Sequence, residues 1–70
     1  MNTIKYVDYE FANLIIISSD KTEEELTPII DSIWANAYPW DWEDVCTALK
    51  INNHIHIYHI VDFSDYTQYP

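Results

Sequence analysis

The sequence contains no glycine and no arginine, and it has one cysteine and three lysines among its 70 residues. Without glycine, the chain cannot build the glycine-rich loops that hold phosphates, the dinucleotide-binding fingerprint or the nucleophile elbow of hydrolases. Its tight turns must use asparagine and aspartate, which accept positive φ more readily than other residues. These absences, together with the small volume available for a pocket, predict that the protein is not an enzyme.

The shortage of basic residues leaves a formal net charge of -9, from 12 Asp and Glu against three Lys. A protein that binds nucleic acid needs Lys and Arg on one face to neutralise phosphates, so the charge argues against direct nucleic-acid binding. It favours the reverse role, in which the chain presents carboxylates to a basic surface on another macromolecule. Soluble domains usually mix both signs of charge, so the missing counter-charge indicates a basic partner.

The single cysteine, Cys46, cannot form an intrachain disulfide, which is typical of a reducing compartment. The first residues lack a signal-peptide pattern, and the longest apolar run, Leu14 to Ile17, is far too short to cross a bilayer. We therefore expect a cytoplasmic protein with no membrane partner, in the host cytoplasm if the chain is phage-encoded. We interpret Cys46 as a small core residue, because nearby carboxylates oppose the thiolate that a nucleophile requires.

The chain nevertheless has the composition of a folded domain. Hydrophobic residues make up 49% of it and aromatic residues 16%, whereas disordered acidic tails are poor in aromatics. Its length suits one domain, which we expect to span residues 1–63, followed by a flexible tail over residues 64–70.

Three stretches have the pattern of β-strands. Residues 4–11 and 54–63 alternate with period two, which predicts half-buried strands. Residues 14–17 are a β-branched run, typical of a strand that is buried on both faces or lies in the centre of a small sheet. The short turn at residues 12–13 joins the first two strands into a hairpin.

A first helix is predicted after the hairpin. Thr22 and Glu25 have the spacing of a capping box, which places the start of the helix after Thr22. Pro28 allows an alternative in which the helix starts later, with Thr27 as its cap.

A second helix is predicted to begin at Asp41, with the Trp40 ring packed against Val45 across the cap. The element order is then β-β-α-α-β. It predicts an α+β fold, a three-stranded antiparallel sheet with two helices on one face and the apolar second strand in the centre.

The histidines raise the possibility of a metal site. His54, His56 and Asp62 share one face of the third predicted strand, and two imidazoles with a carboxylate are plausible ligands of Zn or Fe. No other Cys or His completes a familiar ligand spacing. We therefore expect no cofactor, with His54 and His56 as surface imidazoles and His59 buried and hydrogen-bonded.

Three tryptophans, Trp34, Trp40 and Trp42, flank the turn between the two predicted helices, with Tyr38 beside them. A core this small cannot bury all three indoles, so we expect at least one of them to be exposed. Exposed aromatic side chains anchor protein interfaces and the charges around them steer association. The patch would bind a partner, or pair two copies of the chain in a homodimer.

The segment from Asp31 to Val45 reads DSIWANAYPWDWEDV. In it a helix ends in an Ala/Asn-rich turn and is followed by a proline, an aromatic residue and the next acidic helix. This phrase resembles part of the phage anti-restriction DNA mimics of the overcome-classical-restriction type. The resemblance implies that certain carboxylates stand in for DNA phosphates, namely Asp31, Asp41, Glu43 and Asp44.

The leading hypothesis is a small acidic phage-type inhibitor that blocks the nucleic-acid-binding surface of a host defence protein, either a restriction or a CRISPR effector. The alternative is a host-directed regulatory or antitoxin-like module that acts through its aromatic patch, and a third class is a small histidine-metal enzyme. The expected partner-binding residues are the acidic groups of the two helices and two tryptophans: Glu23, Glu24, Glu25, Asp31, Trp40, Asp41, Trp42, Glu43 and Asp44.

Overall fold

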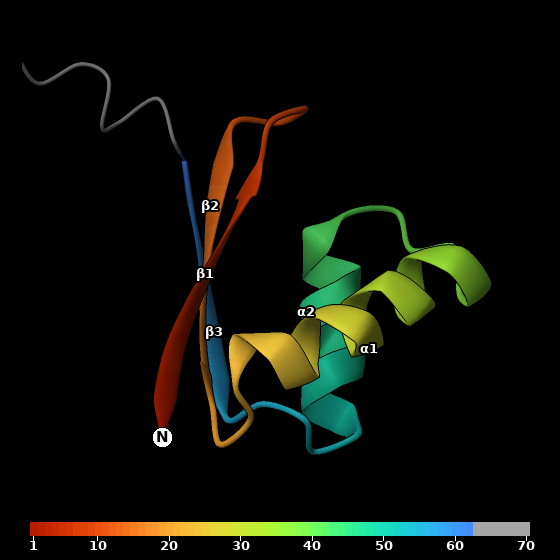
Figure 1. Ribbon diagram of the computed structural model, residues 1–70. Coiled ribbons are helices and arrows are strands. Elements are labelled where there is room, and N and C mark those ends of the chain that lie inside the picture. Colours follow the sequence, from red (N-terminus) through yellow and green to blue (C-terminus); the bar gives the residue numbers. More distant parts are fainter. Residues whose placement is uncertain (63–70) are drawn as a thin grey trace, which may run out of the picture.

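The computed structural model describes residues 1–62, which form a three-stranded sheet and two helices (Figure 1). The elements are β1 (Asn2–Asp8), β2 (Asn13–Ser19), α1 (Glu23–Asn36), α2 (Trp42–Ile51) and β3 (Ile57–Asp62). The sheet is antiparallel with strand order β1-β2-β3, and both helices lie on one side of it. The predicted α+β fold, the element order and the central position of the second strand are confirmed. Phe63 and the predicted tail over residues 64–70 lie outside the described residues.

The turn of the β1–β2 hairpin is longer than the sequence predicts. β1 ends at Asp8, because the Asp8 carboxylate accepts hydrogen bonds from the backbone N–H groups of Glu10 (3.0 Å) and Phe11 (3.3 Å). These bonds fold residues 9–12 into a turn, and Ala12 takes a positive φ of 54° before β2 begins. The predicted strand over residues 4–11 is therefore wrong at its end, and Phe11 lies on the exposed hairpin tip. The expectation that asparagine and aspartate supply the positive-φ positions of tight turns is wrong at Ala12 and at Tyr38 (φ 50°), and it holds at Asn53 (φ 62°).

The hydrophobic core lies between the sheet and the two helices. Ile15 and Ile17 of β2 point toward the helices and are fully buried, as are Leu26 of α1 and Leu49 of α2. Cys46 of α2, which the sequence predicts to be a small core residue, lies in this core. The buried members of the core are Ile4, Ile15, Ile17, Leu26, Ile30, Val45, Cys46, Leu49 and Ile55.

α1 begins where the capping box predicts. The Thr22 hydroxyl accepts a hydrogen bond from the Glu25 N–H (3.2 Å), and the Glu25 carboxylate accepts one from the Thr22 N–H (3.0 Å). These two reciprocal bonds satisfy N–H groups that have no partner within a helix. The backbone and side-chain bonds from Thr22 also lower the pKa of Glu25, because they stabilise its ionised form.

The alternative start at Thr27 is wrong, since Pro28 lies inside α1. A proline within a helix costs about 3 kcal/mol. The turn before it compensates, because burying Leu26 contributes about 2 kcal/mol and the cap about 1 kcal/mol. Thr27 has a different role, because its hydroxyl shares a 2.9 Å hydrogen bond with the Tyr6 hydroxyl of β1.

α2 also begins as predicted, because the Asp41 carboxylate accepts a hydrogen bond from the Asp44 N–H at 3.1 Å. The predicted packing of Trp40 on Val45 is wrong. The Trp40 side chain is 91% exposed, whereas Val45 is fully buried. The Trp40 backbone N–H instead donates to the Asp44 carboxylate at 3.0 Å. A backbone hydrogen bond, and not a packed indole, therefore fixes how the chain enters the helix.

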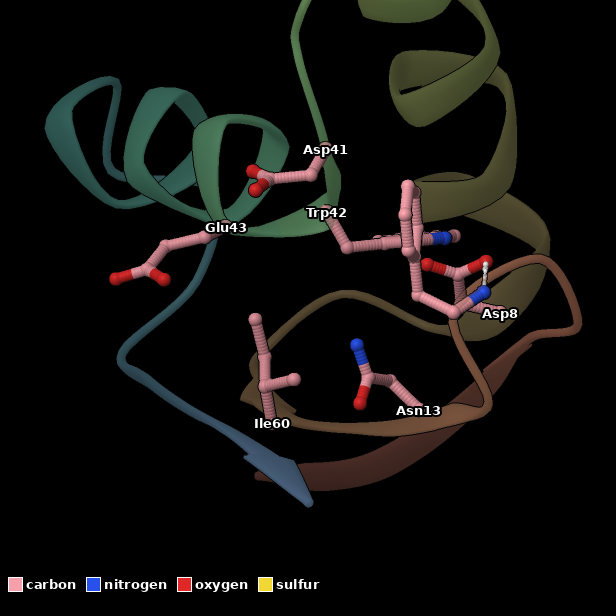
Figure 2. Close-up of a pocket in the computed structure, with 7 residues that line it drawn as sticks. Asp8, Asn13, Asp41, Trp42, Glu43 and Ile60 are labelled. Carbon is pink, nitrogen blue, oxygen red and sulfur yellow. Dashed lines mark hydrogen bonds between the residues drawn. The ribbon is translucent and has the colours of Figure 1, made fainter. Parts of the chain in front are cut away.

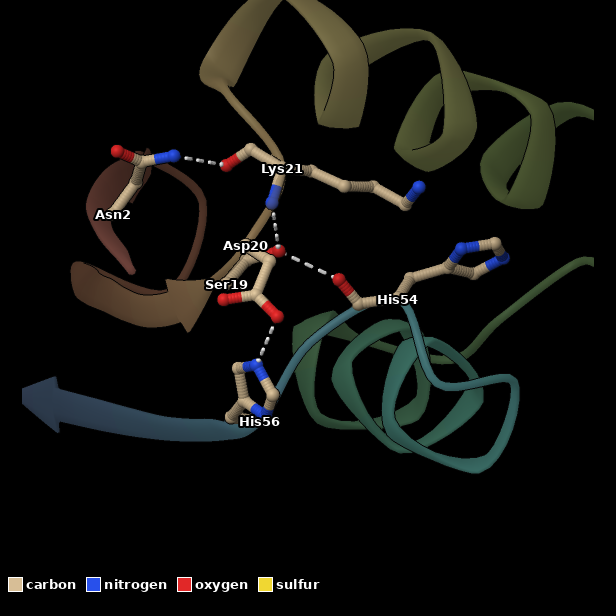
Figure 3. A network of polar contacts seen from close by, with 6 residues as sticks. All are labelled: Asn2, Ser19, Asp20, Lys21, His54 and His56. Carbon is tan, nitrogen blue, oxygen red and sulfur yellow. Dashed lines mark hydrogen bonds and ion pairs between the residues drawn. The ribbon is translucent and has the colours of Figure 1, made fainter.

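β3 begins at Ile57, three residues later than predicted. The Ser19 hydroxyl donates to the His54 carbonyl (2.6 Å) and accepts from the Lys21 N–H (3.0 Å), as Figure 3 shows. This buried serine ties the end of β2 to the segment before β3. Since His54 and His56 precede β3, the strand face that they were predicted to share with Asp62 does not exist.

Among residues 1–62, no helix lies over the far side of the sheet (Figure 1). Within this range β2 is buried on one face and only partly buried on the other, so the alternative in which it is buried on both faces does not hold for the described residues. His59 lies on this uncovered side and is exposed, so its predicted burial is also wrong.

Candidate protein-binding site

A cleft of about 210 Å³ opens between the β1–β2 hairpin and the start of α2 (Figure 2). Figure 2 shows Ile60 and Asn13 rising from the sheet toward Trp42 on α2. The lining combines carboxylates, two aromatic rings and an aliphatic side chain: Asp8, Phe11, Asn13, Asp41, Trp42, Glu43 and Ile60. Three segments that are distant in the sequence thus meet at one end of the sheet.

Trp42 belongs to an aromatic cluster that also contains Tyr6 and Trp34. Its ring stacks on Tyr6 of β1 with 5.3 Å between centroids, and it meets Trp34 of α1 edge-on at 5.8 Å. Aromatic pairs of this kind contribute about 0.5–1.5 kcal/mol beyond their burial. Contacts from two other elements therefore hold the Trp42 ring in place before any partner arrives.

Two carboxylates of α1, Glu23 and Asp31, border the aromatic cluster beside Tyr6. They lie four residues before and after Thr27, and hence on the same face of the helix as the hydroxyl that contacts Tyr6. Burial raises the pKa of the Tyr6 phenol, and the negative charges of Glu23 and Asp31 raise it further, against the opposing effect of the Thr27 hydrogen bond. The raised pKa therefore reflects first the burial of the Tyr6 ring and only secondarily the two carboxylates near it.

The carboxylates near the cluster differ in whether the fold itself uses them. Asp8 organises the hairpin turn and Asp41 caps α2. The side chains of Glu23, Asp31 and Glu43, in contrast, make no hydrogen bond or ion pair with any residue in the described range 1–62. Helix capping and turn formation therefore account for only part of the negative charge at this surface.

The structure places six of the nine predicted partner-binding residues near the two ends of β1. Asp41, Trp42 and Glu43 line the cleft beside Asp8, the last residue of β1. Glu23 lies beside the first residues of β1, in a shallow hollow, with Glu24 and Glu25 in the same helical turn. Seven residues of strand separate the two groups by about 20 Å. Tyr6 links the two groups, because it contacts Thr27 of α1 and Trp42 of α2.

Trp40 and Tyr38 stand apart from the aromatic cluster. Their side chains are 91% and 83% exposed, which confirms the expectation that at least one tryptophan is exposed. Asp44 lies next to Trp40 through the backbone hydrogen bond described above. The turn between the helices is thus a second aromatic surface. Its rings are more exposed than the ring of Trp42, which packs against Tyr6 and Trp34.

Sequence reasoning missed Tyr6, Asp8 and Phe11 as members of the site. The alternation of the first strand does place Tyr6 and Asp8 on one face, and this was the available signal. The pattern does not show that Trp42 packs onto that same face, because Trp42 is 36 positions later in the sequence than Tyr6.

Cys46 lies in the core behind the cleft. Burial, and then the charge of Glu43, raises the pKa of its thiol to about 12. We expect no reaction of the folded protein with a thiol reagent at about pH 8, where an ordinary cysteine is partly ionised. One thiol per chain should react after unfolding in guanidinium. A folded protein that reacts as fast as the unfolded one would contradict this assignment.

The histidines do not come together. His56 Nε2 lies 2.9 Å from the Asp20 carboxylate, as Figure 3 shows, while His59 lies on the uncovered side of the sheet. The hydrogen bond with His56, and then the imidazole charge, lowers the pKa of Asp20. Across residues 1–62, no three His, Cys, Asp or Glu side chains are arranged to hold a metal ion.

Neither of the two described helices has the length and apolar character required to cross a membrane. Comparison with family models, with curated proteins and with solved structures gives no match to this chain. The side chains of the site are therefore the basis for inferring its function.

Proposed function

We propose that this chain is a small acidic phage-type inhibitor, not an enzyme, that occupies the nucleic-acid-binding surface of a host defence protein. The target class is a restriction or CRISPR effector. The observation that carries the proposal is the aromatic cluster of Tyr6, Trp34 and Trp42, bordered by carboxylates that have no hydrogen-bond or ion-pair partner among residues 1–62. Rings held in place provide an anchor, and uncompensated carboxylates attract lysine and arginine on the partner.

The distribution of charge supports DNA mimicry as the mode of binding. The carboxylates extend along β1 from Glu23, past Asp31, to Asp8, Asp41 and Glu43, over about 20 Å. One strand of a DNA duplex carries about six phosphates over the same length. A groove that is lined with Lys and Arg for DNA would meet negative charge over a similar distance here.

The aromatic cluster adds a stacking surface for arginine, which a row of carboxylates alone does not provide. Arginine guanidinium groups stack on tryptophan faces, and such contacts are worth about 1–2 kcal/mol when they are desolvated. The cleft beside Trp42 places Asp8, Asp41 and Glu43 around such a stacking position. Binding would then combine fast, charge-steered association with a fixed anchor.

A competition experiment tests the proposal. Purified restriction and CRISPR nucleases are mixed with a labelled target duplex and increasing amounts of the chain, at about 50 mM and about 300 mM salt. We expect the chain to displace the duplex from at least one nuclease, with a half-inhibitory concentration about tenfold or more higher at the higher salt. Binding that is equally tight at both salt concentrations, with the duplex still bound, would contradict DNA mimicry.

The exposure of Trp40 and Tyr38 favours one second candidate function, a host-directed regulatory or antitoxin-like module. Its complex would form through apolar contacts at the turn between the helices. Binding would then be insensitive to salt, and it would be lost on replacing Trp40 or Tyr38 with alanine.

A further inference from the structure

The uncovered side of the sheet carries five aliphatic residues among its nine, together with Thr3, Lys5, Ser18 and His59. Each strand contributes three alternate residues to it, on the face opposite Ile4, Ile15 and Ile17. Ile57 is 47% exposed in spite of its aliphatic side chain. We call this surface the open sheet face, and its nine residues are Thr3, Lys5, Val7, Leu14, Ile16, Ser18, Ile57, His59 and Val61.

The open sheet face contains no carboxylate. Every Asp and Glu among residues 1–62 lies on a helix, in a turn or at a strand position facing the helices. In the central row of the face, Lys5 and His59 lie on either side of Ile16. In a chain with a net charge of -9, this is the surface where two copies meet with least repulsion.

The sequence of β2 also indicates that this face is covered by a second layer of protein. A continuous aliphatic run is typical of a strand that is covered on both sides. The helices bury Ile15 and Ile17, while Leu14 and Ile16 point the other way and are only partly buried among residues 1–62. Domains this small commonly gain the apolar burial they lack by oligomerisation.

We infer that the open sheet face pairs with the same face of a second copy, which gives a two-fold dimer with Ile16 near its axis. Two sheets that pack face to face lie about 10 Å apart with their side chains interdigitated. In this arrangement the helices of both copies point outward. The acidic surface and the cleft of each copy remain accessible, so the dimer does not depend on the proposed function.

The occupant is a second copy and not the basic partner, because the face offers no carboxylate to a lysine or arginine. Its footprint is about 20 Å by 14 Å, from the length and spacing of the strands. Stable interfaces bury about 800 Å² on each partner, and this face is smaller. We therefore expect a weak, reversible dimer, with a Kd of about 10–100 µM.

Sedimentation equilibrium between about 10 µM and 1 mM tests the inference, a range that brackets the expected Kd. The mass should rise from that of one 8.3 kDa chain toward twice that value. Raising the salt from about 50 to 300 mM should strengthen the dimer, because it screens repulsion between two acidic copies. Binding to a basic partner should weaken over the same salt range.

Two variants locate the interface. Ile57→Glu places a carboxylate on the open sheet face and should abolish the dimer, whereas Ile51→Glu changes an exposed isoleucine of α2 and should leave it intact. Circular dichroism confirms that both variants are folded. A wild-type chain that stays monomeric at about 1 mM would overturn the inference. Equal loss of the dimer in both variants would also overturn it.

Discussion

Ile17→Ala is expected to destabilise the fold by about 3–4 kcal/mol, the largest loss of stability among the changes considered. Ile17 is fully buried, lies on the central strand and pairs with Ile4 on one side and Tyr58 on the other. The alanine would leave a cavity in the middle of the core that neither neighbour fills. Because small domains have only about 5 kcal/mol of stability, the variant should keep about 1–2 kcal/mol, so that roughly a tenth of it is unfolded without denaturant.

Urea unfolding, followed by tryptophan fluorescence and circular dichroism, measures the loss. The matched control is Ile16→Ala, one residue earlier on the same strand but on the open sheet face. At a few micromolar, where the chain is monomeric, this control should cost about 1 kcal/mol or less. Equal losses in the two variants would contradict the assignment of the two faces of β2.

The parts of the fold that the sequence predicted correctly depend on residues close together along the chain. The caps of both helices are examples, because Thr22 contacts Glu25 and Asp41 contacts Asp44, three positions away in each case. The element order followed from the same local patterns. Such interactions join residues that are close in the sequence, so their spacing indicates them directly, although the structure was needed to decide between Thr22 and Thr27 as the cap of α1.

The ends of the strands were harder to predict, because side chains there form hydrogen bonds with backbone groups that would otherwise pair between strands. The Asp8 carboxylate accepts hydrogen bonds from two backbone N–H groups of the hairpin turn, and the Ser19 hydroxyl donates one to the His54 carbonyl. Alternation of apolar and polar residues continues through both places and carries no sign of either bond.

Only part of the candidate site was predicted from the sequence, namely Asp41, Trp42 and Glu43, and its geometry was not predicted. Trp40 and Trp42 look equivalent in the sequence, two residues apart and both beside acidic residues. Tertiary contacts with Tyr6 and Trp34 separate them, leaving one indole held in place and the other in solvent. Contacts between residues that are far apart in the sequence decided this difference, and no local pattern encodes it.

That difference leads to the second large effect, on binding. Trp42→Ala should weaken the complex with the nuclease identified by competition about 30-fold or more, as expected for a buried aromatic anchor. It removes both the wall of the cleft and the support for Tyr6 and Trp34. Trp40→Ala, which removes an indole of the same size from an exposed position, should change the affinity about threefold or less.

Titration calorimetry at low salt compares the two variants, with urea unfolding to confirm that each is folded. Trp42→Phe serves as a further control, because it keeps an aromatic ring in the stack and should recover most of the affinity. If Trp40→Ala abolishes binding while Trp42→Ala does not, the anchor is the turn between the helices. The salt-insensitive regulatory module would then replace the DNA mimic as the proposed function. The carboxylates around the cleft would no longer surround the contact that holds the partner.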